Sequence, residues 1–205
     1  MLAIQCAKLN PETADLARRL EAQLSTVGGM VESFLKKNDE KVQAIAEQCY
    51  HMSMIFFVSG GPNWATALEA SLKVKEAVRI HSEGFEVEEV AHGPRLLLDK
   101  ESAVIIIEPG GRSLQRSIDI ARGLSELVGL TIVVTSEREK ELMKTTEQPI
   151  LLPGQMDELL SPILYIVPMQ LLTYYMTIKK GFNPDILRQD AQYLRSSQIL
   201  RTRLQ

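Results

Sequence analysis

Residues 53–63, SMIFFVSGGPN, decide the fold class of this 205-residue chain. A short run of apolar, β-favouring side chains leads directly into a turn of two glycines and a proline. Apolar residues at helical spacing then continue over residues 65–81. This order predicts a strand, a glycine-rich turn and a helix.

The same unit recurs along the chain. We expect further strands at residues 103–108 (AVIIIE), 131–135 (TIVVT) and 149–152, each followed by a helix, at 113–128, 137–145 and from 161 onward. Near-continuous apolar strands that alternate with amphipathic helices indicate a parallel sheet covered on both faces. We therefore predict an α/β three-layer sandwich with a mainly parallel sheet. Residues 85–98 are too irregular for a plain crossover.

The first fifty residues read as helix throughout. Asn10, Pro11 and Glu12 have the pattern of an N-cap, a proline in the first turn and an acidic first turn, so a helix is predicted to begin there. It should break or kink at Gly28 and Gly29 and resume over residues 30–37 and 39–51. We divide the chain into an N-terminal helical segment or linker (1–50), an α/β domain (51–182) and a C-terminal tail or helix (183–205).

Composition excludes several classes of function. The net charge is -3 and no basic block is present, which argues against nucleic acid as a partner. The apolar stretch 163–178 is too short for a membrane span and contains Pro168, so we expect a core helix and no membrane association. No secretory signal is visible, and we predict a cytoplasmic protein. Cys6 and Cys49 have no metal-ligand spacing, so we expect buried thiols, no metal and no cofactor.

Three charged residues share one face of the helix that follows Gly61. Glu69, Lys73 and Glu76 are spaced i, i+4 and i+7. Such triplets are commonly solvated, salt-bridged surface. A functional role is the alternative, because this helix begins at a turn in the position where parallel α/β sheets bind ligands.

His92 precedes Gly93 and Pro94 and therefore lies in a sharply turned loop. An imidazole titrates near neutral pH and can pass a proton in either direction. A loop histidine held only by local backbone is the competing interpretation. His51 and His81 are weaker candidates, because each is expected near a helix C-terminus, where a histidine is electrostatically favourable without any catalytic role.

Two glycine-rich turns are candidates for phosphate binding, because exposed backbone N–H groups at a helix N-terminus attract anions. The predicted substrate-binding residues in them are Ser59, Gly60, Gly61 and Asn63 in the first turn and Gly110, Gly111, Arg112 and Ser113 in the second. Neither turn contains a GxxxxGK[ST] motif, and tight turns without a ligand remain an equal alternative.

Several of these residues fall in segments that resemble one family. ALEASLKVKE (67–76), IHSE (80–83), EVAHGP (89–94) and SPILYIVPMQLL (161–172) occur in the order found in SIS (sugar isomerase) domains. The similarity is greatest to the second SIS domain in the isomerase half of glucosamine-6-phosphate synthases, and it covers roughly residues 40–195. It implies a flavodoxin-like fold and a sugar phosphate as ligand.

The resemblance also implies roles for three residues. Glu76 matches the glutamate that moves a proton between C1 and C2 of an open-chain sugar, and Lys73 matches the lysine one turn before it. His92 matches the histidine associated with ring opening, which in that family comes from the neighbouring subunit. The implied partner is therefore a second copy, as a homodimer, or another SIS domain.

Three departures limit what the resemblance implies. The family's C-terminal site lysine is replaced by Gln192, which favours fructosamine-6-phosphate deglycases over synthase-type isomerases. Cys6 does not match the N-terminal nucleophile of a glutaminase half. The turn at residues 108–113 lacks the hydroxyls of the family's Ser-x-Ser-Gly-x-Thr phosphate loop. Gln192 is kept as a predicted substrate-binding residue.

Three functions remain open on this basis. The first is an enzyme that isomerises, deaminates or deglycates a 6-phosphorylated ketoamine or amino sugar. The second is a binding module that recognises a sugar phosphate without turnover. The third is a half-subunit that completes its site with a partner.

Overall fold

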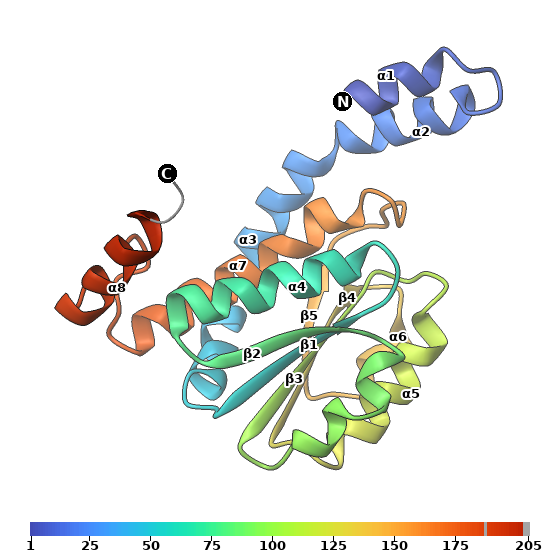
Figure 1. Ribbon diagram of the computed structural model, residues 1–205. Helices are drawn as coiled ribbons and strands as arrows, with labels where there is room; N and C mark the ends of the chain where they lie inside the picture. The colour runs from blue at the N-terminus through green and yellow to red at the C-terminus, as the bar shows by residue number, and fades with distance from the viewer. Residues whose placement is uncertain (187, 203–205) are drawn as a thin grey trace.

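One sheet of five parallel strands organises the molecule, in the order β2-β1-β3-β4-β5 (Figure 1). This computed structural model describes residues 1–186 and 188–202. The predicted α/β sandwich with a parallel sheet is confirmed. The strands are β1 (Met54–Ser59), β2 (His81–Glu86), β3 (Ser102–Glu108), β4 (Leu130–Ser136) and β5 (Gln148–Leu152). The helices are α1 (Leu2–Lys8), α2 (Ala14–Leu24), α3 (Val27–Cys49), α4 (Asn63–Lys73), α5 (Leu114–Ser125), α6 (Lys140–Met143), α7 (Ser161–Lys179) and α8 (Ala191–Thr202).

Alternate strand residues face two separate hydrophobic clusters, as a strand's period of two requires. Ile55 and Phe57 of β1 pack with α3, α4 and α7 on one face of the sheet. Phe56 and Val58 pack with α5 and α6 on the other. Both faces of the central strands are therefore dry, which explains why these strands read as continuous apolar runs.

The segment after α4 differs from the prediction of a helix over residues 65–81. α4 ends at Lys73, a π-helical turn covers Val74–Val78, and β2 begins at His81. His81 is thus in a strand, where its Nε2 lies 3.1 Å from Oε1 of Glu83, and the predicted helix C-terminus there is wrong. The apolar pattern misled because buried Val74 and Val78 keep the i, i+4 spacing of an α-helix within the π-helical turn.

A glycine allows α4 to lie directly on β2. A Cβ atom at Gly84 would approach the backbone of Ala67 to 2.7 Å, closer than real side chains come. The polar edge strand β2 is therefore fixed against α4 by close backbone packing. The two short 3-10 turns that follow, Glu89–Ala91 and Pro94–Leu97, account for the irregular segment expected between residues 85 and 98.

The N-terminal helices are partly as predicted. Asn10 does form a turn, in which its Oδ1 accepts the N–H of Glu12, but α2 starts only at Ala14. The residues before the turn form α1, in agreement with the reading of the first fifty residues as helix. The break falls before Val27, so Gly28 and Gly29 lie inside α3, which runs unbroken to Cys49. α1 and α2 form an arm that extends away from the sheet (Figure 1).

From Phe34 onward, α3 belongs to the core of the sheet domain. Phe34, Val42 and Ile45 are fully buried in the cluster that also contains α4 and α7.

Cys49 is buried as expected, but Cys6 is exposed on the arm, so the prediction of two buried thiols is wrong for Cys6. The domain boundaries remain predictions, and residues 187 and 203–205 of the predicted tail lie outside the described part.

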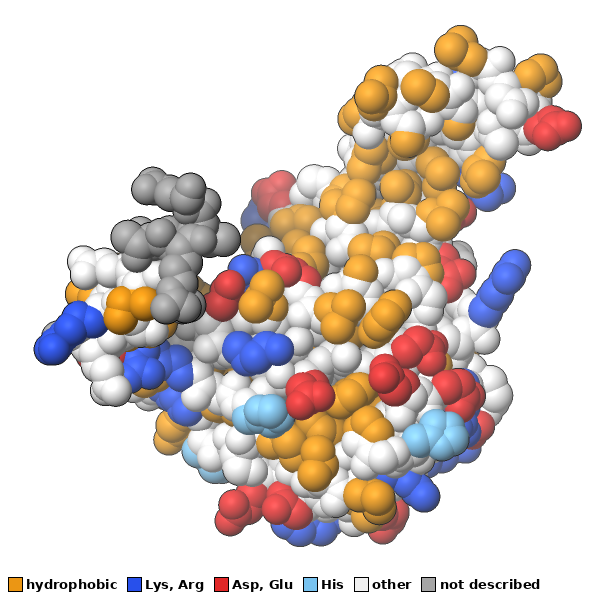
Figure 2. Space-filling view, viewed as in Figure 1, with side chains coloured by type: hydrophobic (Ala, Val, Ile, Leu, Met, Phe, Trp, Pro, Cys, Tyr) orange, Lys and Arg blue, Asp and Glu red, His pale blue; other side chains and the backbone are white. Residues whose placement is uncertain are grey.

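α7 is a core helix, as predicted for this apolar stretch. Its buried face includes Leu164, Met169 and Met176. Within the described residues, no helix has the length and apolar character needed to cross a membrane. The outer faces of α4 and α7 nevertheless carry exposed hydrophobic side chains, which gather over these helices in Figure 2. The set comprises Trp64, Leu68, Leu72, Ile163, Tyr174 and Ile178.

Candidate functional site

The predicted charged triplet is assembled at the end of α4. Lys73 Nζ lies 2.7 Å from Glu76 Oε2 and 3.5 Å from Glu69 Oε1. The hydrogen bond to Glu76 raises the pKa of the Lys73 ammonium; partial desolvation opposes this, and the charge of Glu69 adds to it. The side chains of Lys73 and Glu76 remain 38% and 41% exposed. The carboxylate and ammonium are therefore paired with each other and accessible from outside.

Glu76 lies on the π-helical turn, a conformation that is rare and is often found at functional sites. Arg79 closes this turn in the left-handed conformation, with φ 61° and ψ 39°, and its N–H donates to the carbonyl of Val74 at 2.9 Å. The chain thereby changes direction immediately after Glu76 and enters β2.

A small hollow adjoins Lys73. It has a volume of about 160 Å³, and α4, the π-helical turn and α7 contribute its walls together with the chain after α7. Apart from Lys73 the walls are uncharged: Ala77, Gln170, Thr173, Tyr174, Thr177 and Pro184. Among the described residues, Lys73 is thus the one charged residue beside this small hollow.

The glycine-rich turns lie at the opposite edge of the sheet. α4 begins just after the carboxyl end of β1 and runs back to the start of β2, where His81 pairs with Met54. Lys73 and Glu76 are therefore near the amino ends of the strands, while the predicted phosphate turns lie at the carboxyl ends. The structure brings together Glu69, Lys73 and Glu76, but it does not bring them to the predicted phosphate site.

In the first turn, the polar side chains are used for internal contacts. Ser59 donates a hydrogen bond to the carbonyl of Ile107 on the neighbouring strand. Asn63 Nδ2 donates to Ser161 Oγ at 2.6 Å, which ties α4 to α7. Ser59 and Asn63 are both fully buried. These contacts favour a structural role for the two predicted substrate-binding side chains.

Glu108, which the sequence prediction missed, organises the second turn. Its Oε1 accepts the N–H of Gly110 at 3.0 Å, and its Oε2 accepts the hydroxyls of Ser113 and Ser117, each at 2.7 Å. The residue is fully buried. The available signal was a glutamate at the end of an otherwise apolar strand, followed by two serines at i, i+4 spacing.

A second carboxylate lies between the two turns. Gly61 has a φ of +56°, and a Cβ atom there would lie 2.7 Å from Oε1 of Glu158, while a Cβ atom at Gly111 would lie 3.0 Å from the same carboxylate group. Glu158 thus lies against both turns, beside the starts of α4 and α5. A phosphate at this edge would meet a negative charge.

The cleft around Glu158 is acidic on balance. It has a volume of about 690 Å³, and its charged lining consists of Glu86, Glu88, Asp157 and Glu158 against Arg112 and Arg116. Arg116 Nε lies 2.7 Å from Oε1 of Glu88, so part of the positive charge is already paired. Gly60 is packed against Ser113, where a Cβ atom would lie only 2.5 Å from that side chain. The predicted residues of the two turns are therefore neighbours, as a shared phosphate site would require. The groups that they surround, however, are the carboxylates of acidic side chains.

His92 lies on the other face of the sheet from Glu76. It follows the first 3-10 turn and lines a hollow of about 430 Å³ together with Asp119 and other residues of α5, and with Leu127 just after that helix. Its side chain is exposed. Gln192, the remaining predicted site residue, is an exposed residue of α8 beyond the end of α7. The structure therefore does not bring Glu76 and His92 together within one chain.

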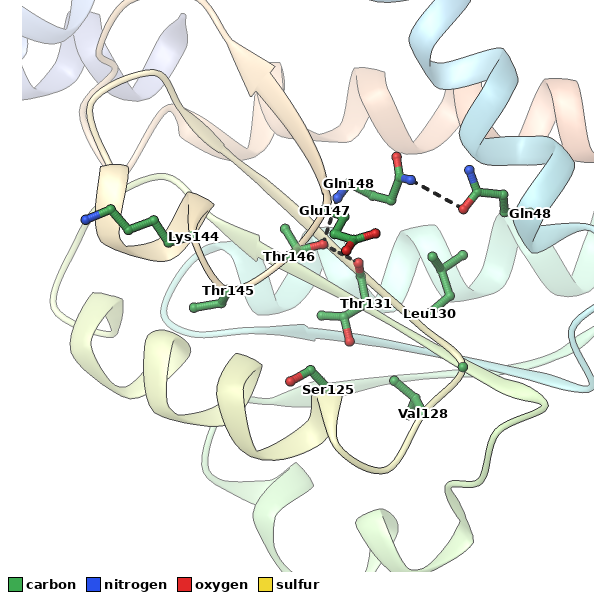
Figure 3. Close-up of a pocket in the computed structure, with 11 residues that line it drawn as sticks. Gln48, Ser125, Val128, Leu130, Thr131, Lys144, Thr145, Thr146, Glu147 and Gln148 are labelled. Atoms are coloured by element: carbon green, nitrogen blue, oxygen red, sulfur yellow. Dashed lines mark hydrogen bonds between the residues drawn. The ribbon is translucent and has the colours of Figure 1, made fainter.

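A further hollow of about 460 Å³ lies between α3, α5 and the amino ends of β4 and β5 (Figure 3). Its walls are rich in amide and hydroxyl groups, and Gln148 Nε2 donates to Gln48 Oε1 at 3.4 Å across it. None of the predicted site residues lines it. Within the described part of the chain, no three His, Cys, Asp or Glu side chains are grouped to hold a metal ion.

Comparisons with known proteins agree with this architecture. Residues 48–180 match the model of the SIS domain family. The chain is 37% identical over 186 residues to the isomerizing glutamine–fructose-6-phosphate aminotransferase of Thermococcus kodakarensis, covering 90% of this chain and 30% of that protein. The C-terminal domain of the glucosamine-fructose-6-phosphate aminotransferase of Francisella tularensis superposes with a TM-score of 0.74 at 25% identity, covering 85% of this chain and 48% of that one.

A tagatose-6-phosphate ketose/aldose isomerase from Escherichia coli has the same fold. It superposes with a TM-score of 0.67 at 17% identity, covering 80% of this chain and 47% of that one. The chain thus spans under a third of the Thermococcus protein and about half of either solved chain. The sheet order, the family match and the identity to the Thermococcus protein together establish that this chain belongs to the SIS domain family.

Proposed function

We propose that this chain is a sugar-phosphate isomerase-type domain in which Glu76 moves the proton. The observation that carries the proposal is the Lys73–Glu76 pair on the π-helical turn, with Nζ and Oε2 2.7 Å apart and both side chains partly exposed. Aldose-ketose interconversion requires a base that removes a proton from one carbon and returns it to the next. A carboxylate held by one ammonium and still open to a ligand meets that requirement.

The names of two relatives support the proposed substrate class. The Thermococcus protein is named for fructose-6-phosphate as its substrate, and the E. coli enzyme for tagatose-6-phosphate. We propose a 6-phosphorylated ketoamine or amino sugar for this chain, converted through an enediol or enaminol by isomerisation, deamination or deglycation. Gln192 in the position of the family's lysine favours the deglycase branch, where that lysine is not needed.

Two copies would form the site. Glu76 lies in the layer of α3, α4 and α7, whereas His92 lies against α5 on the opposite face of the sheet. We propose that His92 of a second copy reaches Glu76, where its imidazole transfers a proton to or from the sugar oxygens during ring opening. The substrate would then lie between subunits, over the exposed ends of α4 and α7.

The phosphate group would be bound by another SIS domain. The glycine-rich turns of this chain hold Glu108 and Glu158, and like charges disfavour a phosphate there. A neighbouring domain with a hydroxyl-rich loop would supply the missing contacts. This part of the proposal rests on the carboxylates found at the carboxyl edge of the sheet.

Glu76→Gln tests the catalytic role. Loss of a general base lowers turnover by about 10²- to 10⁴-fold. The partly exposed ion pair contributes at most about 1 kcal/mol to the free energy of unfolding, so the melting temperature should change by only a few degrees. Turnover of a panel of 6-phospho sugars and ketoamines is followed by NMR, using the assembled protein.

Glu69→Gln is the matched control, because Glu69 contacts the same ammonium at 3.5 Å from the other side. It should keep most of the activity. Retention of wild-type turnover by Glu76→Gln would remove Glu76 from the mechanism.

A non-catalytic sugar-phosphate-binding module is the second candidate. The observations that favour it are the carboxylate-filled turns and Gln192 in place of a lysine. It predicts a saturable rise in melting temperature with a sugar phosphate, but no product by NMR. Product formation that depends on Glu76 would exclude this function.

A further inference from the structure

The chain after α7 folds back against the turn that carries Glu76. Gly181, with a φ of +76°, ends the helix, and the N–H of Phe182 donates to the carbonyl of Thr177 at 3.1 Å. The guanidinium carbon of Arg79 lies 4.2 Å from the centre of the Phe182 ring. Two residues further on, Pro184 borders the same hollow as Lys73. The segment after α7 therefore contacts Arg79 at one end of the π-helical turn and shares a hollow with Lys73 at the other end.

Arg79 has a backbone conformation that an arginine does not favour. Among the described residues it is the only one other than glycine with a positive φ. Glycine adopts this conformation without steric cost, and asparagine or aspartate more readily than arginine does. The backbone conformation alone therefore does not explain why residue 79 is an arginine. The contact between the Arg79 side chain and the Phe182 ring does explain it.

We propose that Arg79 and Phe182 are positioning residues that hold the π-helical turn in the form that presents Glu76 to the substrate. This inference rests on the proposed function of Glu76. A π-helical turn holds one residue more than an α-helical turn, so its loss would rotate the residues on one side relative to the other by about 100°. Such a rotation would separate Glu76 from Lys73 or turn it away from the ligand.

The contact between Arg79 and Phe182 holds the π-helical turn at its C-terminal end. Arg79 is attached to the turn through its N–H bond to Val74, and Phe182 is attached to α7 through its own N–H bond. The attraction between the Arg79 cation and the face of the Phe182 ring then links these two hydrogen-bonded residues to each other. The π-helical turn is in this way tied to a core helix, while the side chain of Glu76 hydrogen-bonds only to Lys73 within the described part of the chain.

Three substitutions separate this role from general stability. Phe182→Leu removes the ring but keeps an apolar side chain, Phe182→Tyr keeps the ring, and Arg79→Gly removes the cation while relieving the positive φ. We expect kcat to fall between about tenfold and a hundredfold in Phe182→Leu and Arg79→Gly, because small displacements of a catalytic group have effects of this size. KM should stay within about twofold.

The control variant and the melting temperatures complete the kinetic test. Phe182→Tyr should retain wild-type kcat, and Arg79→Gly should melt within about 2 °C of the wild type, since relief of backbone strain offsets the lost contact. A purely structural role would instead lower stability and activity together. Wild-type kcat in both Phe182→Leu and Arg79→Gly, in a preparation that Glu76→Gln inactivates, would overturn the proposal.

Hydrogen exchange tests the same contact without any need for turnover. The backbone amides of residues 74–80 should exchange several times faster in Phe182→Leu than in the wild type or Phe182→Tyr. Unchanged exchange in Phe182→Leu would refute the positioning contact even if the protein is an active isomerase. Conversely, faster exchange in a protein that shows no Glu76-dependent turnover would support the contact and count against the proposed function.

Discussion

Replacement of Glu108 by glutamine tests how much the Glu108 carboxylate stabilises the turn at the carboxyl ends of the strands. The carboxylate is fully buried and accepts three hydrogen bonds, from the Gly110 N–H at 3.0 Å and from the Ser113 and Ser117 hydroxyls at 2.7 Å each. A glutamine has the same shape but only one accepting oxygen. If that oxygen faces the two serines, the side-chain NH₂ group faces the backbone N–H of Gly110.

The expected cost follows from that mismatch. A buried donor left without a partner costs about 1–3 kcal/mol, and the two remaining bonds lose their charge assistance. We therefore expect the free energy of unfolding to fall by about 2–4 kcal/mol. In a domain of this size the melting temperature changes by about 2–4 °C per kcal/mol, which predicts a decrease of roughly 5–15 °C.

Thermal and urea unfolding, followed by circular dichroism, measure this effect. Ser117→Ala is the matched control, because it removes one of the three donors and leaves the carboxylate paired with the other two. It should cost only about 1 kcal/mol. A melting temperature for Glu108→Gln within 2 °C of the wild type would contradict the argument that the Glu108 carboxylate organises this turn through its three hydrogen bonds.

Two further predictions concern the core and the thiols. Gly84→Ala should lower the free energy of unfolding by about 1–3 kcal/mol, because the added Cβ would meet the backbone of Ala67 at 2.7 Å; unchanged urea unfolding would show that α4 does not rest on β2 as described. In a disulfide-exchange assay the native protein should expose one reactive thiol, Cys6, whereas Cys49 should react only after unfolding, since burial raises its pKa to about 12. Two fast-reacting thiols in the native protein would contradict the burial of Cys49 in α3.

Much of the sheet was predictable because its central strands are dry on both faces. Residues 55–58 and 103–107 are buried throughout, so they appear in the sequence as unbroken apolar runs. The edge strand β2 escaped prediction for the opposite reason. Its sequence HSEGFE is largely polar, and the helical pattern before it ends not at a proline or a glycine but at Arg79 in a left-handed conformation.

The candidate site was predictable only as far as local spacing reaches. The i, i+4 and i+7 pattern placed Glu69, Lys73 and Glu76 on one face, and the structure has them in contact. Spacing could not show that α4 carries Glu76 to the amino edge of the sheet, away from the glycine-rich turns. Nor could it show that Glu158, almost a hundred residues after Gly61, fills the space beside that turn.

The central claim is that Glu76 of one copy and His92 of another act in the same site. Mixing Glu76→Gln with His92→Ala subunits tests it, by co-expression with two different tags. Neither variant should be active alone. With random pairing, half of the dimers are mixed and each mixed dimer has one intact site, so about a quarter of wild-type activity should return. A mixture no more active than the separate variants would show that Glu76 and His92 of different copies do not share a site, and would contradict the account.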